Sequence, residues 1–371
     1  MKKLLKLFIL CVLLAVFPFL SQAQSGKGMP GEEKAQNLVL THPTVSNLRT
    51  MINLVDKELI SLEGFRLVGV YHHHERYDYS RSRQFLDTLG YVDCDIVLRE
   101  ITDTIHPEVL YGKNELSDDY RTIFRQSSGV IFFGGPDLPP EVYGEQTSLY
   151  TSIYDPFRHY FELSFLHHLL GGSQQSGMRP LMQNNPGYLV YGFCLGMQTM
   201  NVATGGTLVQ DIPSGIYNLR YVEEILRLDR DRIHRNYNRA IHVDEDLISG
   251  SFHSVHFSQS PYTSRLALDG FHPVVYSNHH QAVDEPGRGF QVTATSMDGK
   301  VVEGIIHERY DNVIGVQFHP EAYFLYDTTR TFRIAGDDTL SFTGWEMLEK
   351  TRSLEFHKKY WKDFERRLRE Q

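Results

Sequence analysis

Short apolar runs alternate with segments of helical spacing through the first half of the chain. The apolar runs, typical of buried strands, lie at 65–71, 95–98, 129–133 and 188–191, and the segments with helical spacing lie at 45–62, 80–89 and 156–170. Strands separated by helices predict an α/β fold with a mostly parallel central sheet and helices on both faces. In such sheets, binding and catalytic residues gather at the carboxyl ends of the strands.

One of these helices shows all of its boundary signals. Asp155 can cap its start, Pro156 suits its first position and Gly171 can end it. Its large apolar residues recur every four positions, at Phe157, Phe161, Phe165 and Leu169. We interpret this stripe as core packing and not as a cofactor site.

The second half of the chain is richer in strands. Strand-like segments lie at 239–243, 265–268, 274–277, 290–295, 301–307 and 313–318. Met297-Asp298-Gly299 is typical of a hairpin turn between two of them. Residues 345–371 are predicted as one charged amphipathic helix, with a packing face made by Phe356, Tyr360, Phe364 and Leu368.

Composition places the chain among ordinary soluble globular proteins. Its 371 residues are 41% hydrophobic and 22% charged, which is enough to bury a sizeable core. The formal net charge of −9, without any basic stripe, argues against nucleic acid as a partner.

The N-terminus has the pattern of a secretory signal peptide. Lysines at positions 2, 3 and 6 precede an apolar run at 7–20, and the small residues Ser21 and Ala23 indicate cleavage before Gln24. The alternative is a membrane anchor, but the run is short for a span of about 20 residues. We therefore expect an exported protein, periplasmic or extracellular, with no stable membrane span after processing.

The expected organisation is a signal peptide at 1–23, an N-terminal extension at 24–60 and one domain at 61–371. Cys94 and Cys194 are the cysteines that remain after cleavage. An exported protein can pair two cysteines, but Cys94 lies in a strand-like segment, where we expect a buried free thiol.

Cys194 stands in the sequence Gly192-Phe193-Cys194-Leu195-Gly196, between an apolar run and a short helical segment. This is the cysteine version of the nucleophile elbow, a tight strand-to-helix turn whose glycines allow close backbone approach. We expect Cys194 to be exposed at the tip of the turn, where the positive end of the following helix favours the reactive thiolate. The alternative is a small buried residue of the sheet.

A cysteine nucleophile needs a base and a group that orients the base. His319 ends an apolar run, and Glu321 follows it after Pro320. The carboxylate can reach one ring nitrogen of His319 and leave the other facing Cys194. Taken alone, a histidine at a strand end is more often structural.

Together these residues resemble the class I glutamine amidotransferase-like family, and within it the gamma-glutamyl-gamma-aminobutyrate hydrolase branch. The likeness covers roughly residues 65–325, and several motifs in the right order are more specific than any one of them. Besides the elbow, it is carried by Gly134-Gly135-Pro136-Asp137, Pro140, Tyr143-Gly144-Glu145, Asn201-Val202, Gly205-Gly206-Thr207-Leu208, Gln210-Asp211, His279-His280-Gln281-Ala282-Val283 and Gly315-Val316-Gln317-Phe318-His319-Pro320-Glu321.

The resemblance implies a flavodoxin-like sheet and a hydrolase that cleaves a small gamma-glutamyl amide or isopeptide through a thioester. By this resemblance Cys194 attacks the carbonyl, His319 transfers the proton and Glu321 orients His319. The backbone N–H groups of Gly135 and Leu195 bind the oxyanion. The resemblance implies neither a metal nor a cofactor.

Other polar residues near these motifs are candidates for substrate contact. Gln198, one turn into the elbow helix, can contact the glutamyl group or bind local backbone. His279 and His280 can contact substrate or form a satisfied structural pair. The segment His72-His73-His74-Glu75 can rim the pocket, and a metal site is an alternative there, although adjacent histidines in one loop rarely all face one ion.

Some positions depart from the pattern of the family. Leu195 stands where relatives often carry Arg, Tyr276 where they often carry Asn, and His159 where they often carry Asp. The segment 217–264 also looks longer than usual. These departures put the identity of the substrate in doubt more than the activity.

Two other functions remain open. A glutaminase that delivers ammonia to a synthase partner is disfavoured by the signal peptide, because such synthases generally depend on cytosolic ATP. A non-catalytic binding protein is disfavoured by the intact Cys194, His319 and Glu321. The sequence leaves the amine leaving group open and is compatible with a homodimer.

Overall fold

The computed structural model describes residues 36–90, 95–175, 177–266 and 268–371, which share a ten-stranded sheet. Its order is β3-β2-β1-β4-β5-β12-β11-β10-β7-β8; neighbours are parallel from β3 to β12 and antiparallel from β12 to β8. The mostly parallel sheet predicted from the sequence is therefore confirmed. The strands are β1 (Gln36–Thr41), β2 (Phe65–His72), β3 (Ile96–Ile101), β4 (Gly129–Phe132), β5 (Leu189–Phe193), β7 (Ser251–Phe257), β8 (Val274–Ser277), β10 (Phe290–Ser296), β11 (Val302–His307) and β12 (Val313–Val316).

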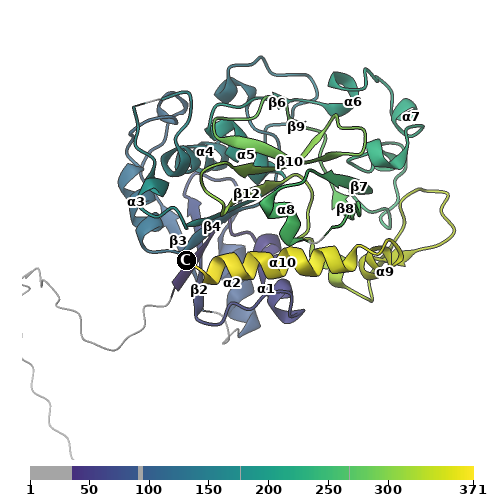
Figure 1. Cartoon of the computed structure of the whole chain (residues 1–371), viewed down its shortest axis with the longest axis horizontal. Coiled ribbons are helices and arrows are strands. Elements are labelled where there is room, and N and C mark those ends of the chain that lie inside the picture. Colours follow the sequence, from purple (N-terminus) through teal and green to yellow (C-terminus); the bar gives the residue numbers. More distant parts are fainter. Residues whose placement is uncertain (1–35, 91–94, 176, 267) are drawn as a thin grey trace, which may run out of the picture. The chain divides into compact units, whose positions relative to one another are not determined.

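Helices cover both faces of the sheet (Figure 1). Because side chains alternate along a strand, Leu38 and Leu40 of β1 enter one apolar cluster and Val39 enters the other. The first cluster receives α1 (Val45–Asp56), α2 (Ser80–Leu89) and α10 (Leu354–Arg369), and the second receives α3 (Ser117–Arg125), α4 (Pro156–Leu170) and α5 (Leu195–Ala203). In Figure 1 the long α10 accordingly lies on the side of α1 and α2, away from α4 and α5.

Short elements complete the described part of the chain. Two small antiparallel pairs join β6 (Leu208–Val209) to β9 (Ala282–Val283) and β13 (Thr331–Phe332) to β14 (Phe342–Thr343). The short helices are α6 (Ile212–Gly215), α7 (Val222–Ile225), α8 (Pro261–Arg265) and α9 (Gly344–Lys350). None of the helices in these ranges combines the length and the apolarity that a membrane crossing requires.

The boundaries of α4 follow the sequence prediction. The Asp155 carboxylate accepts a hydrogen bond from the backbone N–H of Arg158 at 3.3 Å, and Gly171 ends the helix with φ +72°. Phe161, Phe165 and Leu169 are fully buried, so the stripe is core packing as expected.

The register of β5 positions the candidate site. Gly192 of β5 is paired with Phe132 of β4 on one side and with Gly315 of β12 on the other. The three strands therefore end side by side, and the residues that follow them meet at one edge of the sheet.

The expected N-terminal extension at 24–60 is wrong for its described part. Gln36–Thr41 forms β1, which pairs with β2 and β4 in the parallel half of the sheet, and α1 contributes buried residues to the core. Compactness likewise places the domain boundary before Ala35 instead of at 61. The strand was missed because only Leu38, Val39 and Leu40 form an apolar run in it. The predicted signal peptide at 1–23 and Cys94 lie outside the described residues.

Two predicted strands are also wrong, and a second strand of the main sheet was missed besides β1. The segment 239–243 overlaps a short 3₁₀ helix at Tyr237–Ala240. The segment 265–268 begins on the last residue of α8, whose start Ser260 caps through a capping box, and its residue 267 lies outside the described residues. The missed strand is β7, in which Ser251 and His253 are buried together with Phe252. Buried polar residues hide the apolar alternation that identifies a strand.

The predicted C-terminal helix is divided in two. Arg352 adopts a left-handed conformation with φ +60°, and the Ser353 hydroxyl accepts a hydrogen bond from the backbone N–H of Val274 at 2.8 Å. This contact fixes the break between α9 and α10 against β8. The packing face that was predicted for α10 is buried, at Phe356, Tyr360, Phe364 and Leu368.

Gly196→Ala should lower the free energy of unfolding by about 2 kcal/mol, measured by urea denaturation, because its methyl group would overlap the Phe132 carbonyl oxygen. Gly112→Ala is the matched control: its methyl would meet nothing closer than 3.6 Å, and its stability should stay within about 0.5 kcal/mol of the native protein. Equal stability of the two variants would contradict the close approach of β4 and α5.

Candidate active site

Cys194 occupies a tight turn between β5 and α5. Its backbone is strained, with φ +51° and ψ −107°. Methyl groups cannot be accommodated at the two flanking glycines, since one at Gly192 would lie 2.6 Å from the Gly196 carbonyl carbon and one at Gly196 would overlap the Phe132 carbonyl oxygen. The strand, turn and helix thus have the geometry of a nucleophile elbow.

The expectation that Cys194 is exposed is wrong, because only 5% of the residue is accessible. The loop after β4 and the ring of His319 cover it: a methyl group on Gly134 would lie 3.5 Å from the Cys194 Cβ and 2.7 Å from the His319 Cε1. The sulfur therefore lies in a closed, partly desolvated site at the amino end of α5.

His319 bridges Cys194 and Glu321. Its Nδ1 lies 2.8 Å from the Glu321 Oε1, and its ring lies on the same side of Gly134 as the Cys194 side chain. Burial lowers the pKa of His319, but the Glu321 carboxylate and the Cys194 sulfur outweigh burial and hold that pKa well above its usual range. The raised pKa favours the imidazolium form of His319.

Tyr276 supports His319 from β8. The backbone N–H of His319 donates to the Tyr276 carbonyl at 2.8 Å, and the two rings lie 6.1 Å apart. The Tyr276 hydroxyl forms a 2.9 Å hydrogen bond with the Ser249 hydroxyl. Tyr276, one of the departures from the family pattern, therefore packs beside His319 and keeps a partner for its own hydroxyl.

Arg158 holds the loop that contains Gly134 and Gly135. Its guanidinium donates to the carbonyl oxygens of Phe133 at 2.8 Å and Gly134 at 3.1 Å, and it pairs with Glu162 at 3.2 Å. In a trans peptide the N–H points opposite to the preceding carbonyl, so the Gly135 N–H points away from Arg158. Gly135 also lies against Leu195, because a methyl group on it would be 2.9 Å from the Leu195 Cδ2. The two predicted oxyanion donors are thus neighbours.

The three residues predicted to contact substrate, Gln198, His279 and His280, have different surroundings in the structure. Gln198 is buried and donates to the Gln281 carbonyl at 3.2 Å and to the Gln317 side chain at 3.1 Å, which is the structural alternative. His279 is also buried, in a polar cluster with Glu303.

His280 alone of these three joins the loops of the site. Its Nε2 lies 3.1 Å from the Asp137 carboxylate and its Nδ1 3.2 Å from Asp211. Burial lowers its pKa, but the hydrogen bonds and charges of the two carboxylates outweigh burial and raise it to about 9. A cationic His280 therefore links the loop after β4 to the start of α6. Asp137 and Asp211 stand in quoted motifs, but no sequence pattern indicated that they share one imidazole.

The contacts of the His72 segment stabilise the end of β2 and the loop that follows it. His72 Nε2 contacts the Asp103 carbonyl at 2.9 Å, and its Nδ1 accepts from the His74 backbone N–H at 3.3 Å. Glu75 is buried and bound by the Tyr79 hydroxyl and the His72 backbone N–H. Both nitrogens of His72 are thus occupied.

A cavity of about 610 Å³ adjoins His280. Asp211, the His280 partner, and Asn278 line one side of it. Most of its other lining residues come from the segment 217–264 and include three arginines, Arg220, Arg235 and Arg239. The cavity wall therefore carries more positive than negative side chains.

The sequence profile of the family described as Peptidase C26 matches residues 101–321, more than half of the chain. The chain belongs to the Peptidase C26 family. The matched range includes the elbow, the Gly134–Gly135 loop, His319 and Glu321. β1 and β2 precede it, so the family match leaves out part of the sheet that the structure describes.

Relatives of this Peptidase C26 chain include glutamine amidotransferase-like proteins of Rickettsia prowazekii, 26% identical over 55% of this chain and 74% of the relative, and of Lactococcus lactis subsp. lactis, 27% identical over 56% and 71%. A Mycobacterium tuberculosis protein provisionally described as a glutamine amidotransferase is 30% identical over 58% of this chain, which spans only 56% of that relative. A solved glutamine amido transferase from Methylobacillus flagellatus overlaps 89% of this chain and 95% of its own, with 12% identity and a TM-score of 0.41.

Alkylation of Cys194 by iodoacetamide should be slower near neutral pH in Glu321→Gln than in the native protein. Without the carboxylate the pKa of His319 falls, so the imidazolium that stabilises the thiolate is lost at a lower pH. Mass spectrometry of the Cys194 peptide measures the rate across pH, and Cys194→Ala gives the background from other cysteines. Identical pH profiles for both proteins would show that Glu321 does not act on the His319–Cys194 pair.

Proposed function

We propose that the protein is an exported cysteine hydrolase that cleaves a gamma-glutamyl amide or isopeptide bond. The observation that carries this proposal is the meeting of Cys194, the His319–Glu321 pair and the Gly134–Gly135 loop at one edge of the sheet. Membership of the Peptidase C26 family supports a hydrolase or amidotransferase, and the resemblance of the motifs favours the gamma-glutamyl hydrolase branch.

In the proposed reaction the Cys194 sulfur attacks the carbonyl carbon of the amide. The negative charge that develops on the carbonyl oxygen is bound by the N–H groups of Gly135 and Leu195, each worth about 10²–10³ in rate. His319 gives its proton to the leaving nitrogen, the C–N bond breaks and the amine departs. The gamma-glutamyl group remains on Cys194 as a thioester.

Water completes the reaction. Neutral His319 takes a proton from the water as the oxygen attacks the thioester carbonyl, and the same two N–H groups bind the second oxyanion. The C–S bond breaks, Cys194 leaves as the thiolate and His319 is again the imidazolium. Glu321 keeps the ring oriented and favours its charged form in both steps.

The arginine-lined cavity is the proposed site for the amine leaving group. Asp211 connects this cavity to His280, which in turn contacts the loop that carries Gly135. Since the arginines outnumber the acidic side chains in its wall, we propose that the amine portion carries a negative charge, as an amino acid does at its carboxylate. The signal peptide pattern would place this substrate in the periplasm or outside the cell.

Purified protein should release the amine from at least one member of a panel of gamma-glutamyl amides, with glutamine as one member. Cys194→Ala should lose this release by at least about 10³-fold, since the thioester can no longer form. Ammonia from glutamine alone would favour the glutaminase alternative. Silence of the native protein across the panel, with Cys194 unreactive toward iodoacetamide, would replace the hydrolase by a binding protein.

Arg235→Ala should raise KM about tenfold for amides with anionic leaving groups, because one charge that faces the leaving group is lost. The same variant should leave KM for neutral leaving groups nearly unchanged. Arg227→Ala is the matched control, since Arg227 is exposed on the same segment but does not line the cavity. Parallel changes for both classes of amide would place the leaving group elsewhere.

A further inference from the structure

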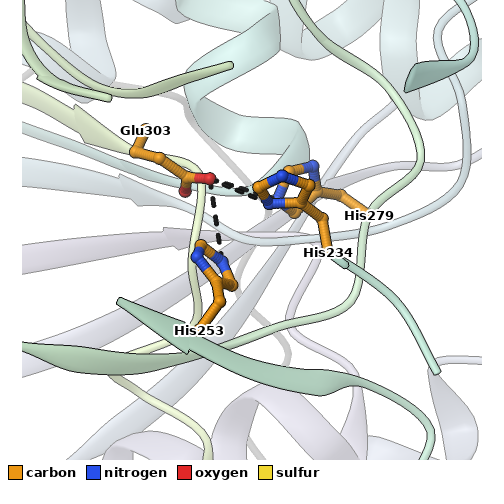
Figure 2. Close-up of side chains that lie close together, drawn as sticks. All are labelled: His234, His253, His279 and Glu303. Carbon is orange, nitrogen blue, oxygen red and sulfur yellow. Dashed lines mark ion pairs between the residues drawn. The ribbon is translucent and has the colours of Figure 1, made fainter. Parts of the chain in front are cut away.

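Three histidines and one glutamate from four separate segments lie close together in the interior (Figure 2). None of these segments contains Cys194. His253 comes from β7, Glu303 from β11, His279 from the loop after β8 and His234 from the long segment before β7. None of the four is more than 4% exposed, and the four potential ligand atoms lie within 4.8 Å of one another.

The hydrogen bonds of two of these histidines direct a lone pair at Glu303. The Gln281 carbonyl lies 2.9 Å from the Nδ1 of His279 and can only accept, so this nitrogen carries the hydrogen and Nε2 does not. The Ser254 carbonyl fixes His253 in the same way, at 3.2 Å. A backbone carbonyl on the outer nitrogen is the usual support of a metal-binding histidine.

The polar atoms in the centre of the cluster lack hydrogen-bond partners. Both carboxylate oxygens of Glu303, both nitrogens of His234 and the Nε2 of His279 are buried without one. His234 Nδ1 is 3.0 Å from the Glu303 Oε1, yet not in hydrogen-bond geometry. Buried polar groups without partners are costly, and lone pairs that face a carboxylate repel it unless a cation or a proton lies between them.

The distances suit a small divalent ion. Glu303 Oε1 lies 3.0, 3.7 and 3.9 Å from the facing nitrogens of His234, His253 and His279. Tetrahedral Zn²⁺ with ligands at 2.0–2.1 Å needs them about 3.3 Å apart, so small side-chain shifts bring all four into its reach. His253 Nε2, which is also 2.8 Å from the Ser277 hydroxyl, would exchange that contact for the ion.

We propose that His234, His253, His279 and Glu303 form a binding site for a divalent transition metal, with Zn²⁺ as the ion that this three-nitrogen, one-oxygen set fits best. Four protein ligands complete a tetrahedral shell and leave no position for water or substrate, which is the pattern of a structural site.

The site would fasten the segment that lines the arginine cavity to the sheet. The backbone N–H of His279 already donates to the His234 carbonyl at 3.0 Å, and the Glu303 carbonyl accepts from Gln317 at 2.9 Å. His279 precedes His280, and Gln317 lies two residues before His319. The ion would therefore fix the cavity wall and two strand ends of the active site without taking part in the reaction.

The His72-His73-His74 group is a weaker candidate for the same ion. Its histidines are adjacent in one loop, His74 is exposed, and both nitrogens of His72 are already bound. It therefore supplies a matched control for the buried site.

The test is the metal content of the full chain, expressed without a histidine tag and dialysed against metal-free buffer. We expect about one zinc ion per chain by mass spectrometry of the elements. Replacement by Co²⁺ should give the intense visible absorption of a tetrahedral site, and removal of the ion should lower the melting temperature by several degrees.

Glu303→Gln keeps the shape of the side chain and should lower the zinc content severalfold, as should His253→Asn if the first variant does not fold. His73→Ala with His74→Ala, and separately Cys194→Ala, should keep the native content. Native protein that takes up neither Zn²⁺ nor Co²⁺ would overturn the proposal. Metal that persists in Glu303→Gln and His253→Asn, or that is lost with the His73 and His74 pair or with Cys194, would also overturn it.

Discussion

The candidate site depends on how closely the backbones of β4, β5 and α5 approach one another. No side chain fits at Gly192 or Gly196, where the elbow passes over the Phe132 carbonyl. Because β5 is held in register between β4 and β12, this approach brings the turn with Cys194 beside the loop with Gly135 and the end of the strand that leads to His319. The register of the sheet therefore sets where the candidate catalytic residues lie, and their side-chain contacts add the final geometry.

Beneath this edge, buried charge orients the backbone. Arg158 and Glu162 are almost inaccessible, and such a pair adds little net stability because desolvation offsets its attraction. The pair instead orients the loop: the guanidinium binds the successive carbonyls of Phe133 and Gly134, so the N–H groups of Gly134 and Gly135, which follow these carbonyls, point away from it. Arg158 makes these contacts, whereas both ring nitrogens of the neighbouring His159 are buried without a hydrogen-bond partner.

The sequence predicts what local signals encode. The glycines around Cys194, the caps of α4 and the His-Pro-Glu order each act within a few residues, and the fold followed from apolar periodicity. Two strands were not predicted: the apolar run of β1 is short, and buried polar residues interrupt the apolar alternation of β7. The burial of Cys194 and the shared imidazole of His280 depend on contacts between distant loops, which no spacing reveals. The three histidines around Glu303 likewise come from separate segments, so no sequence spacing reveals their cluster.

The long segment 217–264 links the arginine cavity to the buried histidine cluster. His234 lies in this segment directly before Arg235 and Asn236, which line the arginine cavity, and the Asn236 side chain donates to the Ile248 and Ile334 carbonyls at 2.8 Å each. A displacement of His234 cannot leave these neighbours in place, because one peptide unit separates each pair. The contact of His234 with Glu303 at 3.0 Å therefore ties the wall of the cavity to β11, while the elbow, His319 and Glu321 lie on other segments of the chain.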